Sequence, residues 1–180
     1  AAPGAGFSET KEFLEFFQKE ELKPYWWETR LWNLYDATVY AENLFHCPTV
    51  AYSGAVDRQK QAADIMARYM EREGLSLTHL VGPDTAHSYH PQTKRELEDR
   101  IDALARIGRD PLPRKIRFTT HTLRYHRMHW ITLTGLQEHW QKARIVAEME
   151  DDSIVRIRTQ NVSAFRVDMA SGTCPLDPTR

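Results

Sequence analysis

Apolar positions at the start of the chain follow a helical period. Residues 8–22 (SETKEFLEFFQKEEL) carry apolar residues at helical spacing behind a serine, so they predict a helix capped by Ser8. Residues 25–45 are rich in aromatic residues and predict one or two further helices. Because helices that pack on a sheet need large apolar side chains, we expect these aromatics to lie in the core.

A strand, a helix, a second strand and a second helix follow in that order. Residues 48–53 (PTVAYS) are short, β-branched and aromatic and end at Gly54, which favours a buried strand. Residues 59–73 carry an apolar stripe typical of a helix, and residues 75–83 predict another strand. The final helix is expected over residues 90–108. This order is that of a parallel α/β sheet, and the predicted fold class is α/β.

The last third of the chain changes character after the proline-bearing linker GRDPLPRK. Alternating apolar and polar residues over short segments predict strands at residues 115–125, 127–136, 143–150, 153–160 and 162–169. Closely spaced strands with little helix favour an antiparallel sheet or a partial sandwich. We therefore expect two domains, an α/β portion over residues 1–108 and a β-rich accessory region over residues 109–180.

Composition limits the choice of partners. The chain has 180 residues, 41% of them hydrophobic, and a formal net charge of −1. This charge gives no electrostatic reason to expect binding to nucleic acid or to an anionic membrane. The sequence holds no apolar run long enough to cross a bilayer, so no membrane insertion is expected. The residues at either end do not resemble natural termini, and AAPGAG in particular resembles the end of a buried strand running into a turn, which favours a fragment of a longer protein.

No cofactor or metal is expected. Cys47 and Cys174 lie far apart and lack metal-ligand spacing. The cluster HTLRYHRMH contains His121, His126 and His129, but on a strand His126 would point away from the other two. No cysteine or acid completes a site there, which argues against metal binding.

An acid and a histidine follow the two predicted parallel strands. Asp57 lies just beyond the first strand, and His87 lies in the loop after the second. Because the carboxyl ends of neighbouring parallel strands meet at one edge of a sheet, the two side chains are expected to meet. A histidine whose Nδ1 proton is held by a carboxylate is suited to act as a general base. Two alternatives remain open: Asp57 as a simple helix cap, and His90 as the base.

The segment PTVAYSGAVDRQKQAADIMARYMEREGLSLTHLVGPDTAHSYHPQTKRE resembles the C-terminal part of the prolyl-oligopeptidase-like serine hydrolases, which have the α/β-hydrolase fold. AAPGAGF similarly resembles the strand that follows the nucleophile helix in that family. The chain order in these enzymes is serine, aspartate, histidine. The resemblance implies that Asp57 is the acid of a catalytic triad and His87 its base.

The family's nucleophile motif G-x-S-x-G does not occur in the chain. Ser8 and Ser53 lack the paired glycines, and Ser53 lies inside a predicted strand. The resemblance therefore implies that the serine belongs to a missing N-terminal half of the same protein. The intact protein is expected to be a serine peptidase acting on a peptide substrate. A carboxylesterase acting on an ester substrate, and a noncatalytic binding or scaffold module, are the alternatives.

Overall fold

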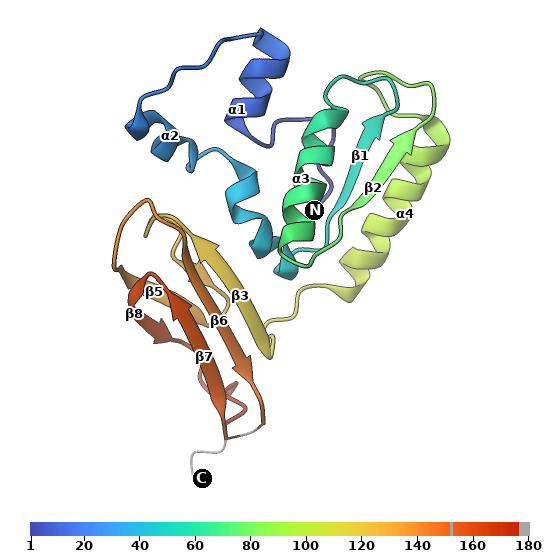
Figure 1. Ribbon diagram of the computed structural model, residues 1–180. Coiled ribbons are helices and arrows are strands. Elements are labelled where there is room, and N and C mark those ends of the chain that lie inside the picture. The colour runs from blue at the N-terminus through green and yellow to red at the C-terminus, as the bar shows by residue number, and fades with distance from the viewer. Residues whose placement is uncertain (152, 177–180) are drawn as a thin grey trace. The chain divides into compact units, whose positions relative to one another are not determined.

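The computed structural model describes residues 1–151 and 153–176. The chain divides into two compact units, Ala1–Gly108 and Arg109–Arg180 (Figure 1). The division falls at the start of the segment GRDPLPRK. The first unit contains both helices and parallel strands, and the second contains antiparallel strands, so the chain has the mixed α/β character expected of it.

Two parallel strands form the centre of the first unit. Strand β1 (Val50–Gly54) pairs in parallel with β2 (Thr78–Gly82), and Val50 lies opposite Thr78. Helix α3 (Lys60–Arg72) connects the two strands, and α4 (Pro91–Ile107) follows β2 (Figure 1). Pro91 occupies the first turn of α4, where its missing N–H has no cost. The predicted order of strand, helix, strand and helix is confirmed.

The two faces of this small sheet pack against different helices. Val50 and Tyr52 on β1 form an apolar cluster with Leu97 on α4. On the other face, Ser53 bonds to His79 of β2, which lies near Asp64 of α3. Because side chains alternate along a strand, α3 and α4 cover opposite faces.

The first three residues extend the sheet along the free edge of β1. The N–H of Val50 donates to the carbonyl of Ala1 at 2.9 Å, and the N–H of Tyr52 donates to the carbonyl of Pro3 at 3.0 Å. The amino group of Ala1 also donates to the carbonyl of Pro48 at 2.6 Å. From the first bond to the second, the donor and the acceptor both move two residues toward the C-terminus, which is the pattern of two parallel strands. The expected burial of this segment is wrong, because residues 1–4 are exposed.

Short helices connect this edge to β1, and their termini differ from the prediction. They are α1 (Thr10–Phe13), the π-helix η1 (Leu14–Gln18), α2 (Trp26–Trp32) and the 3-10 helix η2 (Ala37–His46). Ser8 does not cap α1, since the residue preceding that helix is Glu9. The N–H and hydroxyl of Thr10 instead donate to the carboxylate of Asp36, at 2.8 and 2.5 Å. Burial raises the pKa of Asp36 above its ordinary value, while the bonds from Thr10 oppose that shift.

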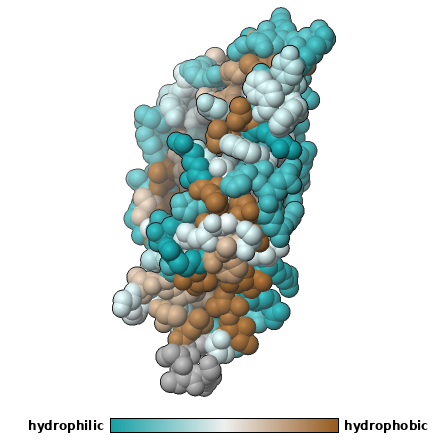
Figure 2. Space-filling model, turned by 90° about the vertical axis from the view of Figure 1, so that its left-hand side faces the viewer, coloured by the Kyte–Doolittle hydropathy of each residue, from teal (hydrophilic) through white to brown (hydrophobic). Residues whose placement is uncertain are grey.

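The expectation that the aromatic residues of this region lie in the core is wrong for α2, which has no buried residue. Trp26 is 69% exposed and Tyr25 is 68% exposed. On the face shown in Figure 2, apolar side chains also lie at the surface among polar ones. Aromatic spacing predicted the helix here, but only packing decides which side of it is covered.

Within residues 109–151 and 153–176, the second unit contains two three-stranded antiparallel sheets. One has the order β3-β6-β7 and the other β4-β5-β8. The bounds are β3 Lys115–Thr120, β4 Arg127–Met128, β5 Ile131–Leu136, β6 Ala143–Met149, β7 Val155–Gln160 and β8 Val162–Val167. A single core contains side chains from both sheets, including Ile116, Ile145, Ile131 and Leu133. The two sheets therefore pack face to face, as a partial sandwich would.

One predicted strand is a hairpin. The segment 127–136 reverses direction at His129 and Trp130, so Arg127 pairs with Thr132 and Met128 with Ile131. His129 has a positive φ of 50°, which suits a two-residue turn and breaks the alternation. The predicted strand over residues 115–125 ends at Thr120. His121, His126 and His129 therefore do not share one strand.

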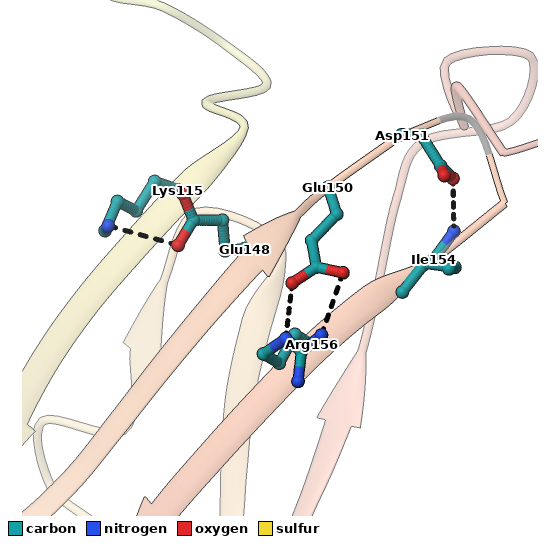
Figure 3. A network of polar contacts seen from close by, with 6 residues as sticks. All are labelled: Lys115, Glu148, Glu150, Asp151, Ile154 and Arg156. Atoms are coloured by element: carbon teal, nitrogen blue, oxygen red, sulfur yellow. Dashed lines mark hydrogen bonds and ion pairs between the residues drawn. The ribbon is translucent and has the colours of Figure 1, made fainter.

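Polar contacts fix the hairpin formed by β6 and β7 (Figure 3). Glu150 accepts a forked pair of bonds from the guanidinium of Arg156. Asp151 accepts from the N–H of Ile154 at 3.0 Å. Beside the hairpin, Lys115 on β3 reaches Glu148 on β6 at 3.1 Å. Cross-strand pairs of this kind favour one register over its neighbours.

Candidate active site

The turn after β1 is bonded to the loop after β2. The N–H of Ala55 donates to the carbonyl of Gly82 at 2.8 Å, and the N–H of Val56 donates to the carbonyl of Thr85 at 3.1 Å. The turn itself closes through the N–H of Asp57, which donates to the carbonyl of Gly54 at 3.2 Å. These bonds hold the segment that carries Asp57 against the segment that carries His87.

Gly54 is required where the two segments touch. A Cβ atom at this position would lie 2.0 Å from the carbonyl oxygen of Thr85 and 2.2 Å from that of Ala86. Both atoms belong to the backbone, so no side chain could rotate away to make room. The absence of a side chain at Gly54 therefore allows the histidine loop to lie directly on the end of β1.

The carboxylate of Asp57 uses its two oxygens differently. Oδ1 accepts the N–H of Gln59 at 2.8 Å, and Oδ2 lies 3.0 Å from Nδ1 of His87. The side chain of Asp57 is only 6% exposed. The residue that precedes α3 is Gln59, so Asp57 orders the turn before the helix without occupying the cap position. The side chain of Asp57 therefore both orders the turn before α3 and contacts His87.

His87 presents its ring to solvent. Its side chain is 69% exposed, although Nδ1 lies against the buried carboxylate. A carboxylate accepts hydrogen bonds only, so this contact requires the proton on Nδ1. In the neutral ring, Nε2 then carries the lone pair and is able to accept a proton. The arrangement is that of a base oriented by an acid.

His90, the alternative base, has a structural role. It is the N-cap of α4, and its Nδ1 accepts the N–H of Thr93 at 3.5 Å. The same nitrogen lies 3.2 Å from the hydroxyl of Thr93. Since these contacts engage Nδ1 at the start of the helix, the geometry favours His87 over His90 as the partner of Asp57.

Apart from this pair, a serine, a histidine and an aspartate lie together on the α3 face of the sheet. The Oγ of Ser53 is 3.0 Å from Nε2 of His79, and Nδ1 of His79 is 3.7 Å from Asp64. Ser53 is fully buried, at 0% exposure, so no substrate carbonyl can reach its hydroxyl. Burial lowers the pKa of His79, which favours the neutral ring, although Asp64 opposes that shift. We interpret this cluster as structural.

Sequence reasoning missed the contact between Ser53 and His79. The parallel register supplies the signal, because it places Ala51 opposite His79 and so brings Ser53 two positions further along the same face.

An apolar cavity of about 580 Å³ lies elsewhere in this unit, lined by residues such as Phe7, Leu44 and Met66. Neither Asp57 nor His87 lines this cavity, so it is separate from the candidate site.

Among residues 1–151 and 153–176, no group of three histidine, cysteine, aspartate or glutamate side chains is arranged to hold a metal ion. Within the same residues, no helix combines the length and apolar character needed to span a membrane.

Comparison of the chain with protein-family models, with curated proteins and with solved structures finds no match. The assignment of a function therefore depends on the geometry of the site.

Proposed function

We propose that the chain is part of a serine hydrolase in which His87 is the general base and Asp57 orients it. The observation that carries this proposal is the 3.0 Å contact between Nδ1 of His87 and the buried carboxylate of Asp57, at the carboxyl ends of two adjacent parallel strands. Open α/β sheets bind ligands at that edge. The exposed ring of His87 supports a role toward a substrate.

The nucleophile in this proposal is a serine outside these residues. The chain lacks the motif G-x-S-x-G, and Ser53 is buried against His79. In the reaction, Nε2 of His87 takes the proton of the serine hydroxyl as its oxygen attacks the substrate carbonyl. The same proton then passes to the departing amine or alcohol. Water attacks the resulting ester in a second step of the same kind, which frees the serine.

The resemblance to prolyl-oligopeptidase-like enzymes favours peptides as substrates. Ester hydrolysis proceeds through the same groups, so a comparison of turnover on peptides and on p-nitrophenyl esters separates the two activities. Substrate preference is set by the pocket around the serine and not by the pair of Asp57 and His87.

The proposal is tested in the intact protein with a fluorophosphonate, which phosphonylates an activated serine. We expect one labelled serine, located by mass spectrometry within a G-x-S-x-G motif outside the 180 residues. His87→Ala should abolish labelling and lower kcat by at least about 1,000-fold, because the serine loses its base. His139→Gln, at an exposed histidine of the second unit, is the matched control and should leave both unchanged.

Unchanged labelling and turnover in the His87→Ala protein would refute the catalytic role of His87. Labelling of a serine within the chain would refute the external nucleophile. An intact protein that takes no label and turns over neither peptides nor esters would instead be a noncatalytic binding or scaffold module.

A further inference from the structure

Tyr52 occupies the centre of β1, directly beneath the histidine loop. Its side chain is almost fully buried, at 4% exposure, and its ring packs with Val50 and Leu97 in the apolar cluster under α4. The ring also lies against Tyr89 of the loop, with centroids 4.6 Å apart. A phenylalanine would satisfy all of these packing contacts equally well, so they do not explain the hydroxyl.

The hydroxyl of Tyr52 bonds to the loop backbone on both sides of Tyr89. It accepts the N–H of His90 at 2.7 Å and donates to the carbonyl of Ser88 at 3.0 Å. Ser88 directly follows His87, so the bond to its carbonyl holds the Ser88–Tyr89 peptide, one residue beyond the histidine that faces Asp57. A hydroxyl that both donates and accepts is fully used here.

The neighbouring backbone leaves space for this hydroxyl. A Cβ at Gly82 would lie 2.3 Å from the hydroxyl oxygen of Tyr52 and 2.8 Å from the Cβ of His90. Gly82 is the last residue of β2, where the histidine loop begins. Because Gly82 has no side chain, the hydroxyl of Tyr52 has the space it needs to reach the loop backbone.

We propose that Tyr52 is a positioning residue for the base His87. This inference rests on the proposed function, because positioning matters only if His87 moves a proton. The histidine ring is largely exposed, so few side chains restrain it directly. Its placement depends on the loop backbone, which contacts Gly54 on one side and is bonded to Tyr52 on the other. Loss of the hydroxyl frees the peptides of residues 88–90 and lets Nδ1 of His87 move away from the carboxylate of Asp57.

The test is Tyr52→Phe in the intact protein, which keeps the ring and removes both hydrogen bonds. We expect kcat to fall by about 10- to 100-fold, because misplacement of a base by about 1 Å costs on that order. KM should change by less than about twofold, since the substrate pocket is untouched. Tyr69→Phe on α3, whose ring lies under the guanidinium of Arg72, is the matched control and should keep full kcat.

A second readout does not depend on activity. In the 180-residue chain, the Nδ1 proton of His87 should give a downfield NMR signal that weakens in the Tyr52→Phe protein and persists in the Tyr69→Phe protein. The His90 amide of the wild-type chain should exchange slowly with solvent, which can be measured even if the variant does not fold. Rapid exchange of that amide would overturn the inference.

The outcomes separate the two proposals. Activity that survives His87→Ala removes the proposed function. Activity that is lost in His87→Ala but remains at wild-type level in Tyr52→Phe, with an unchanged His87 signal, removes only the positioning role of Tyr52.

Discussion

Replacement of Gly54 by alanine is the sharpest single perturbation of the candidate site. The added Cβ would lie 2.0 Å from the carbonyl oxygen of Thr85, 2.2 Å from that of Ala86 and 2.6 Å from the carbonyl carbon of Thr85. Gly54 is not among the glycines with positive φ, so its backbone suits alanine and the whole effect is steric. The variant therefore tests the close approach of the loop and nothing else.

The magnitude follows from these distances. Ordinary van der Waals contact begins at 3.4 Å, so the carbonyl of Thr85 must retreat by about 1.4 Å. That movement breaks the bond from the N–H of Val56 to Thr85 and carries His87 with the loop, away from Asp57. A shift of about 1 Å in a catalytic group costs about 100-fold in rate, and overpacking costs about 1–3 kcal/mol of stability.

The assay compares kcat of the intact protein with the NMR signal of the His87 Nδ1 proton in the 180-residue chain. We expect both to fall in Gly54→Ala. Gly4→Ala is the matched control, since its Cβ would lie 3.6 Å from the hydroxyl of Tyr89, an ordinary contact. Wild-type kcat together with an unchanged His87 signal in Gly54→Ala would refute the argument that close approach of the loop positions the base.

Three further outcomes are expected. Asp57→Asn should lower kcat of the intact protein by about 10,000-fold with little change in melting temperature, because an amide facing Nδ1 favours the wrong tautomer of His87; full activity would contradict this. Burial depresses the pKa of His79 below its ordinary 6.5, so as the pH falls the unfolded chain takes up a proton at this histidine before the folded chain does. The free energy of unfolding should therefore hold above pH 6.5 and decrease as the pH falls below that value. Urea unfolding between pH 7.5 and 5 measures that loss, and its pH dependence should shrink in His79→Gln. Ile145→Ala in the fully buried core of the second unit should cost about 2–5 kcal/mol in urea unfolding, whereas Ile154→Ala, at a 46% exposed position, should cost less than about 0.5 kcal/mol.

Much of the element order could be predicted from local pattern. The strand ending at Gly54, the helix that follows it, the second strand and the helix opened by Pro91 all lie where hydrophobic spacing and glycine or proline signals indicate. These signals act within a few residues of the chain, so the sequence carries them directly. The order alone also predicts adjacent parallel strands with Asp57 and His87 at one edge.

Local pattern failed where the partner lies far along the chain. Ser8 has the right residue type for a cap, but the first N–H of α1 is bonded to Asp36, 26 residues later. The aromatics of α2 have helical spacing, yet none of them is buried, and Trp26 and Trp27 are exposed. His129 turns the predicted strand into a hairpin through a positive φ, which is uncommon for any residue other than glycine.

The sequence by itself determined which residues stand at the ends of the two parallel strands. Tertiary structure alone decided that the loop of His87 lies on Gly54 and is bonded by the hydroxyl of Tyr52, 36 and 38 residues before its partners Ser88 and His90. The reason is physical: a period along the chain records which face of an element is apolar, whereas a close approach or a buried hydrogen bond depends on how two distant backbones meet.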